Sequence, residues 1–188
     1  MQLAEARRIA EWFTRHLRES CLRIEVAGSI RREKPEVNDI ELVAIPRYET
    51  LPAPTDFFGV PSGTGPMTNM LYEALRKIER VQWIKPNTTD IIEWPLKPTA
   101  KWFKGYIPSK DLKIDIFTAT RENWGLIYAI RTGSAEFSHQ KLACQWVKYG
   151  FHSKGGTLYK NGKPFPVPEE KDLFNIIKMP ILAPQLRF

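Results

Sequence analysis

The stretch GSIRREKPEVNDIELV, residues 28–43, decides the fold of this 188-residue chain and points to its chemistry. It couples a glycine-serine turn to two carboxylates, Asp39 and Glu41, in an apolar run. If residues 37–45 form a β-strand, both carboxylates project from one face and the aliphatic side chains beside them project from the other. Two acids on one face repel each other, and they are tolerated when a divalent cation lies between them. Hard oxygen ligands favour Mg²⁺ or Mn²⁺, so the stretch predicts a metal site.

The glycine-serine turn, Gly28 and Ser29, follows an expected strand over residues 23–27. It offers what a phosphate needs: room for close approach of the backbone, free N–H donors and a hydroxyl. Arg31 and Arg32 come directly after it and can neutralise the phosphate charge. We therefore expect this turn to bind the phosphates of a nucleotide.

A third acid, Asp115, lies in the apolar run LKIDIF, where Ile114 and Ile116 flank it. It would be an isolated charge on an otherwise buried strand, and such a charge needs a partner. Any one of the three acids alone could be an ordinary strand-end residue paired with a Lys or Arg, because isolated acid motifs match by chance. Taken together with the turn, they predict a site for a metal and a nucleotide.

These features resemble the nucleotidyltransferase superfamily and, more narrowly, the DNA polymerase β-like family (family X). The residues that carry the resemblance are Gly28, Ser29, Arg32, Asp39, Glu41 and Asp115. Two later blocks support it: IRTGSAEFSHQKLACQWVKYGF, residues 130–151, is similar to the family's palm-to-thumb segment, and PVPEEKDLFNIIKMPILAPQLR, residues 166–187, to its closing pattern. About twenty residues precede the first expected strand, which leaves no room for the family's amino-terminal lyase domain and is typical of a minimal palm-plus-thumb form.

The resemblance implies an α+β fold. Residues 1–124 would form a nucleotidyltransferase palm, a mixed β-sheet with helices on one face and an N-terminal helix, and residues 125–188 a small α/β thumb. It also implies a template-directed DNA polymerase that adds deoxynucleotides to a DNA 3′-hydroxyl by two-metal-ion catalysis, in gap-filling repair. Asp39, Glu41 and Asp115 would be catalytic and would hold two Mg²⁺ ions, or Mn²⁺.

Two further groups of residues are expected to contact the substrates. Those expected at the incoming deoxynucleoside triphosphate are Gly28, Ser29, Arg32, Thr132, Gly133, Ser134 and Ser138. Those expected at the primer-template or gapped DNA are Arg7, Arg15, Lys113, Lys141 and Lys148. Arg7 and Arg15 belong to an arginine row for which a solvated helix face is the default explanation.

The chain departs from the family pattern near the expected nucleotide. Ile130-Arg131 stands where the family commonly has an aromatic pair, Ser138 where it has an asparagine, and Glu41 where it more often has an aspartate. Two other functions stay open: a nucleotidyltransferase acting on a small molecule, an RNA end or a protein, and a non-catalytic DNA-binding scaffold.

The composition is compatible with a polyanionic partner. The formal net charge is +7, and residues 126–188 carry nine Lys or Arg against four Asp or Glu. The two cysteines, Cys21 and Cys144, form no metal or disulfide framework and suggest a reducing compartment. There is no signal peptide and no apolar run of membrane length, so we expect an intracellular monomer, in cytoplasm or nucleoid or encoded by a virus, without a membrane partner.

The remaining pattern predicts further helices, a loop and two hairpin elements. Helices are expected over residues 2–19, 68–79, 124–130 and 169–177, and another should begin near Glu136. Residues 46–66 hold five prolines and three glycines and predict a loop whose Phe57-Phe58 pair anchors in the core. The segment 97–106 interleaves cations and aromatics, and we favour a half-buried hairpin strand over a nucleic-acid contact. Asn161-Gly162 predicts a tight β-hairpin.

Overall fold

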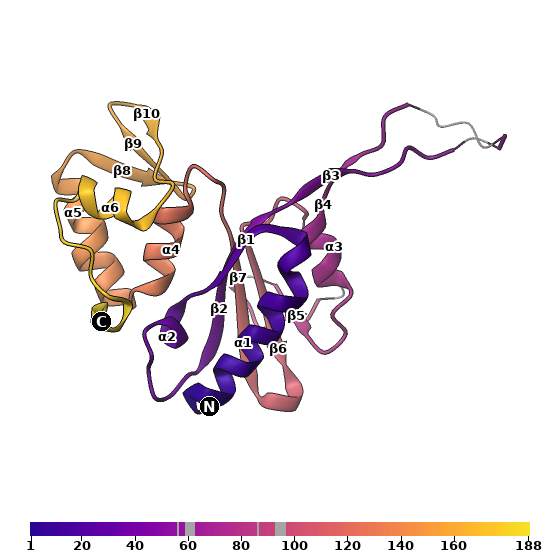
Figure 1. Ribbon diagram of the computed structural model, residues 1–188, viewed down its shortest axis with the longest axis horizontal. Helices are drawn as coiled ribbons and strands as arrows, with labels where there is room; N and C mark the ends of the chain where they lie inside the picture. Colours follow the sequence, from indigo (N-terminus) through magenta and orange to yellow (C-terminus); the bar gives the residue numbers. More distant parts are fainter. Residues whose placement is uncertain (56, 59–62, 86, 93–96) are drawn as a thin grey trace.

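The computed structural model describes residues 1–55, 57–58, 63–85, 87–92 and 97–188. Over these residues the chain is a mixed α+β structure, in which a five-stranded sheet with its helices lies beside a smaller unit made of the C-terminal part of the chain (Figure 1). The α+β class and the mixed sheet that the sequence predicts are confirmed.

The larger sheet has the strand order β1-β2-β7-β6-β5. Its strands are β1 (Cys21–Val26), β2 (Asp39–Pro46), β5 (Gln82–Ile84), β6 (Trp102–Ile107) and β7 (Leu112–Thr118). Strands β2 and β7 are parallel, whereas the other neighbours are antiparallel. Apolar residues of β2 are buried on both faces, with Ile40 and Leu42 in one cluster and Val43 and Ile45 in another, as is usual for parallel strands.

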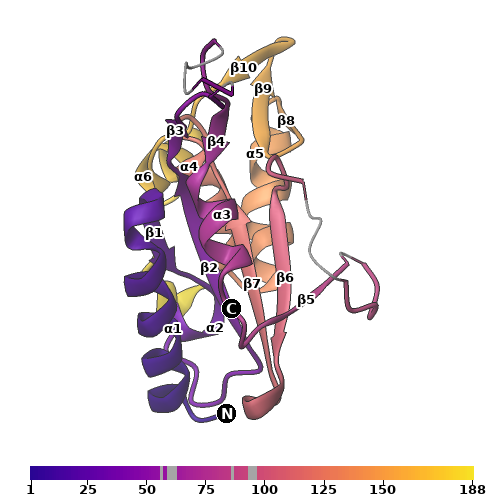
Figure 2. The same ribbon diagram turned by 90° about the vertical axis from the view of Figure 1, so that its right-hand side faces the viewer.

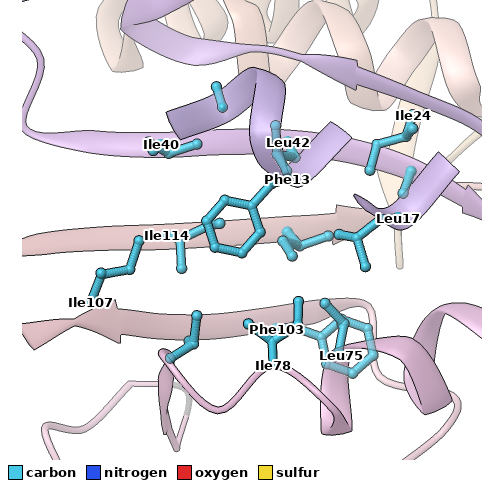
Figure 3. Packing of buried hydrophobic residues seen from close by; sticks show 14 of the residues in the cluster. Phe13, Leu17, Ile24, Ile40, Leu42, Leu75, Ile78, Phe103, Ile107 and Ile114 are labelled. Atoms are coloured by element: carbon cyan, nitrogen blue, oxygen red, sulfur yellow. The ribbon is translucent and has the colours of Figure 1, made fainter. Parts of the chain in front are cut away.

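Helices α1 (Leu3–Leu17) and α3 (Met70–Arg76) cover one face of this sheet (Figures 1 and 2). The α1 sequence places its apolar residues three or four apart, so Phe13 and Leu17 point together into the sheet and are fully buried. Figure 3 shows them packed against Ile114 and Phe103 of the central strands. Burying each such side chain contributes about 1.5–3 kcal/mol, which fixes the helix on the sheet. The predicted N-terminal helix is confirmed, and a 3₁₀ turn, Arg18–Ser20, follows it.

The described part of residues 46–66 is mostly the predicted loop, with one short strand at its start. The strand β3 (Tyr48–Thr50) pairs antiparallel with β4 (Met67–Asn69), and the two form the base of an arm that extends away from the body (Figure 1). Phe57 and Phe58 are 97% and 85% exposed, so the prediction that they anchor in the core is wrong. The arm carries them away from the sheet, and their rings contact each other edge to face instead. The next helix, α3, begins later than predicted because the Asn69 side chain caps it, accepting a bond from the Tyr72 N–H at 3.1 Å.

The hairpin between β6 and β7 agrees with the prediction for residues 97–106. Alternate residues of β6 are buried, and Ile107 closes the strand before a 3₁₀ turn, Pro108–Lys110. Asp111 then adopts a left-handed conformation with φ 47° that turns the chain into β7.

The smaller unit begins with α4 (Trp124–Thr132), which a π-helical segment (Phe137–Ala143) and α5 (Cys144–Lys148) follow. It continues with a three-stranded sheet, β8 (Phe151–Lys154), β9 (Thr157–Lys160) and β10 (Lys163–Phe165), and with α6 (Glu170–Ile176) and a 3₁₀ turn (Pro184–Leu186). Asn161 and Gly162 have φ of 52° and 75°, which confirms the predicted tight hairpin. The helices predicted near residues 124, 136 and 169 are confirmed within three residues at each start.

The two units meet at α4. Trp124 and Tyr128 of this helix pack with Val43, Ile45 and Phe117 on the sheet face that α1 and α3 leave uncovered. The smaller unit also has its own core around Phe137, Leu142, Trp146 and Leu158. The other buried residues of this core are Leu126, Ala129, Phe151, Val167, Leu173, Phe174 and Ile177. The helices in the described ranges include none long and apolar enough to cross a membrane.

Candidate functional site

The three predicted acids share the sheet face that lies beside the smaller unit. In the parallel pairing of β2 with β7, Glu41 stands opposite Asp115, and Asp39 stands opposite Lys113. Partners in such a register point to the same side. The intervening Ile40 is fully buried in the core on the opposite face. Strand periodicity therefore places the carboxylates as the sequence predicted. We name Asp39, Glu41 and Asp115 the carboxylate face.

Gly28 lies directly against this face. It adopts φ +60° and begins a short helical turn, α2 (Gly28–Arg31), in place of the expected simple turn. A Cβ atom at this position would collide with the Glu41 carboxylate. A backbone hydrogen bond keeps the Gly28 turn close to Glu41, because the Ala27 N–H donates to the Glu41 carbonyl at 2.9 Å. Both the positive φ and the close approach require glycine here.

The surroundings of the carboxylate face disfavour the ionised form of two of its acids, Glu41 and Asp115. Burial raises the pKa of Glu41 to about 7, and the charge of Asp39 adds to this effect. Burial also raises the pKa of Asp115, although the Trp102 indole N–H opposes it by donating to Asp115 Oδ1 at 2.8 Å. The site therefore destabilises its own anions, and a bound cation would relieve that repulsion.

One arginine partly offsets this repulsion. The Arg131 guanidinium, on α4, lies 3.6 Å from the centre of the Phe117 ring, and its charge lowers the pKa of both Glu41 and Asp115. Burial lowers the pKa of Arg131 itself, and the two acids oppose that change. Sequence reasoning noted Arg131 only as a departure from the family's aromatic pair. An arginine directly before the Thr132 turn, at a position expected to be aromatic, was the available signal.

The residues that could hold a metal are Asp39, Glu41 and Asp115. Their donors are hard oxygens and suit Mg²⁺ or Mn²⁺, and burial raises the pKa of Glu41 and of Asp115. Within the described ranges, no three His, Cys, Asp or Glu side chains come close enough together to form a metal-binding group. The donor chemistry therefore fits a hard cation, and its oxygens would have to converge by side-chain rotation.

Two buried donors beside the carboxylate face have no hydrogen-bond partner among the residues that the structure describes: Ser29 Oγ and Arg32 Nε. The other end of the Arg32 guanidinium donates to the Thr132 carbonyl at 2.6 Å, which fixes the side chain in place. Burial lowers the pKa of Arg32, and the charges of Glu41 and Asp39 oppose that change. Buried donors without partners are costly, and an anion such as phosphate would satisfy both.

Arg31, by contrast, already has hydrogen-bond partners within the protein and is not free to bind the expected phosphate. Its two terminal nitrogens donate to both oxygens of Glu170 at 2.8 and 2.7 Å, and one also donates to Thr132 Oγ1 at 2.6 Å. Its guanidinium lies 3.8 Å from the centre of the Tyr128 ring. The nearly fully buried Arg187 donates to the same Glu170 carboxylate and to the Leu182 carbonyl. We name this the Arg31–Glu170–Arg187 network; it joins α2 to the C-terminal segment.

The other residues expected at the nucleotide build the turn after α4, and Thr132 also joins this turn to the larger unit. Thr132 is fully buried, and both its hydroxyl and its carbonyl accept bonds from the arginines of α2. Ser134 Oγ accepts from the Phe137 N–H at 3.0 Å, and Ser138 Oγ donates to the Ile130 carbonyl at 2.8 Å. A Cβ on Gly133 would meet the Phe137 ring and Ser138 Oγ at 2.7 Å. These residues build the turn after α4, and only Thr132 is linked to the carboxylate face, through Arg32.

The residues expected at DNA fall into separate places. Lys113 is exposed and lies beside Asp39 in the sheet register, so the structure brings it to the carboxylate face. Lys141 and Lys148 are exposed on the helical segments of the smaller unit. Arg7 pairs with Glu33 at 2.9 Å and Arg15 Nε donates to a carbonyl of its own helix. Both arginines belong to α1, which covers the opposite face of the sheet, so the structure does not bring them to the carboxylate face.

Comparison with protein-family models found no match to this chain, and comparison with curated proteins found none either.

Proposed function

We propose that the protein is a metal-dependent nucleotidyltransferase, and more specifically a template-directed DNA polymerase that extends a DNA 3′-hydroxyl during gap-filling repair. One observation carries the proposal: three mutually repelling carboxylates share a face with two buried donors, Ser29 Oγ and Arg32 Nε, that have no partner in the described structure. The acids need cations and the donors need an anion. A metal-bound nucleoside triphosphate supplies both at once.

Each group then has a distinct role. Asp39, Glu41 and Asp115 would hold two Mg²⁺ ions, which activate the hydroxyl and stabilise negative charge on the phosphates. Ser29 and Arg32 would bind the outer phosphates of the triphosphate, since charge-assisted bonds from an arginine are strong. Asp115 has a raised pKa, which suits a carboxylate that accepts the proton of the attacking hydroxyl.

The narrower assignment to DNA extension rests on the resemblance to the family X polymerases. The block after α4 and the closing segment supply it, and the smaller unit packs beside the carboxylate face through Trp124 and Tyr128. Lys113 stands on the carboxylate face and could meet a primer phosphate as a point charge. DNA and deoxynucleoside triphosphates would be the partners.

The test is primer extension on gapped and ungapped DNA, with each nucleotide offered separately in Mg²⁺ or Mn²⁺. Asp39→Ala and Asp115→Ala should each lower incorporation by on the order of 10³-fold, because electrostatic stabilisation of the transition state is lost. DNA binding should stay nearly unchanged. Glu49→Ala is the matched control, since this acid lies on β3 in a pair with Arg47 away from the site. Substantial extension by either site variant would overturn the assignment, and labelling of another acceptor would redirect it to a different transferase.

A further inference from the structure

A cleft of about 570 Å³ lies between the two units, beyond the carboxylate face. Its floor is apolar and includes Ile45, Phe117 and Ile127. Phe117 follows Asp115 by two residues on β7, a step of roughly 7 Å along the strand. The cleft has the size of ligand sites in proteins, and it does not include the three acids. The cleft adjoins the carboxylate face, and Arg131 belongs to both.

The charges around this cleft all have one sign. Lys101, Arg121 and Arg131 line it, and none of the described residues that line it is acidic. Arg131 lies with its guanidinium 3.6 Å from the centre of the Phe117 ring, which places a cationic group over the aromatic floor. A ligand that fits must therefore combine a negative charge with a flat apolar part.

Hydrogen bonds between the units hold the rim of the cleft in place. Gly155 and Gly156, with φ of 59° and 81°, form the turn between β8 and β9 and face the larger unit. Lys101 Nζ donates to the Gly155 carbonyl at 2.5 Å, and the Asn123 side chain donates to the Gly156 carbonyl at 2.9 Å. The rim is thus a built structure in which both units take part.

We propose that this cleft is an accessory nucleotide site, which takes a nucleotide unit with its base against the Arg131 plane and its phosphate on Arg121. The Phe117 ring is nearly buried and is in contact with Arg131 and Trp102, so a base would stack on the Arg131 guanidinium that lies over this ring, while a phosphate matches the guanidinium fork of Arg121. The same chemistry is offered by a free nucleotide and by one unit of a single strand. The site does not require catalysis at the carboxylate face.

The experiment measures binding in EDTA, without divalent metal, so that metal-dependent nucleotide binding at the carboxylate face does not contribute to the signal. The probes are dAMP, by calorimetry, and a labelled single-stranded oligodeoxynucleotide, by fluorescence anisotropy. Arg121→Glu and Thr99→Glu place a negative charge in the cleft at two exposed positions, which keeps folding intact. Arg121→Glu should weaken binding by about tenfold, the value of a lost charge-assisted bond, and Thr99→Glu should also weaken it because it adds a negative charge beside the phosphate. Arg8→Glu, an exposed substitution with the same change of charge as Arg121→Glu on the helix that covers the opposite face, should stay within about twofold.

Binding of either probe with this pattern supports the site, and the oligonucleotide alone would identify a strand as the source. Failure of both probes to bind, or equal losses in Arg8→Glu and the cleft variants, would overturn it. Asp39→Ala with Asp115→Ala should keep the cleft affinity. If the parent protein binds these probes and extends no primer, the proposed polymerase is refuted and the accessory site stands; extension by the parent protein without this binding would do the reverse.

Discussion

Glu41 and Glu170 are both largely shielded glutamates, yet their surroundings act on them in opposite directions. Burial and the charge of neighbouring Asp39 together raise the pKa of Glu41 to about 7. Burial would also raise the pKa of Glu170, but hydrogen bonds and charge from Arg31 and Arg187 outweigh it, and the pKa is lowered. A paired acid stabilises the junction of the two units. A cluster of acids with too little positive charge costs stability, as at Asp39, Glu41 and Asp115.

The largest stability effect should come from breaking the Arg31–Glu170–Arg187 network. Glu170→Gln removes the charge that compensates two arginines, one of them 1% exposed, and should lower the free energy of unfolding by about 3 kcal/mol. Urea unfolding measures the change. Glu169→Gln is the matched control, because its pair with Arg23 is 35% and 47% exposed and should contribute no more than about 1 kcal/mol. Equal losses in the two variants would show that the network contributes no more than a surface pair.

Substitution of Glu41 is expected to have the reverse effect and to raise the free energy of unfolding at neutral pH. Its pKa in the folded protein lies above the ordinary 4.5, so the folded protein keeps a proton that the unfolded chain releases between about pH 4.5 and 7. Its contribution to stability is present below pH 4.5 and is lost as the pH rises through 7. Glu41→Gln should remove this loss and be more stable than the parent at pH 8 by about 2 kcal/mol.

This measurement is made by urea unfolding in EDTA across pH 4 to 8. Glu170 provides the internal contrast, because an acid with a lowered pKa stabilises above its ordinary pKa and loses that contribution as the pH falls through the folded value. The two glutamine variants should therefore shift stability at neutral pH in opposite directions. If the stability of Glu41→Gln has the same pH dependence as that of the parent, ionisation of Glu41 does not destabilise the folded protein.

Local sequence patterns were sufficient to predict the parts of the fold that follow strand alternation, helical spacing or a turn motif. Alternation in β2 predicted that Asp39 and Glu41 share a face, and the predicted helix over residues 2–19 is present as α1. The Asn161-Gly162 turn was equally readable, because only a few residue types favour φ above zero at both positions. These features depend on contacts within one element or between neighbours in the chain.

The remainder depends on contacts between distant residues. Arg31 meets Glu170 across 139 positions, and nothing in the local pattern assigns it to that acid instead of a phosphate. The Phe57-Phe58 pair looks like a core anchor by composition, but the β3–β4 arm carries it into solvent. Arg131 gained its place at the site only through the packing of α4 on the sheet.

The smallest expected effect contrasts two serine hydroxyls. Ser29 Oγ is buried without a hydrogen-bond partner in the described ranges, whereas Ser134 Oγ accepts from the Phe137 N–H at 3.0 Å. Ser134→Ala should therefore lower the free energy of unfolding by about 1 kcal/mol, as loss of a helix cap does. Ser29→Ala removes no internal bond, so stability should stay within about 0.5 kcal/mol or rise slightly.

The same pair separates structure from ligand binding. Ser29→Ala should weaken binding of a nucleoside triphosphate in Mg²⁺ by about two- to tenfold, since one hydrogen bond contributes roughly 0.5–1.5 kcal/mol. Ser134→Ala should leave that affinity unchanged at temperatures where it is folded, because its hydroxyl is already bonded. Urea unfolding and calorimetric titration of both variants give the four values. If Ser29→Ala loses stability and keeps its affinity, its hydroxyl has a structural partner, and the phosphate-binding role that we assign to this buried donor is wrong.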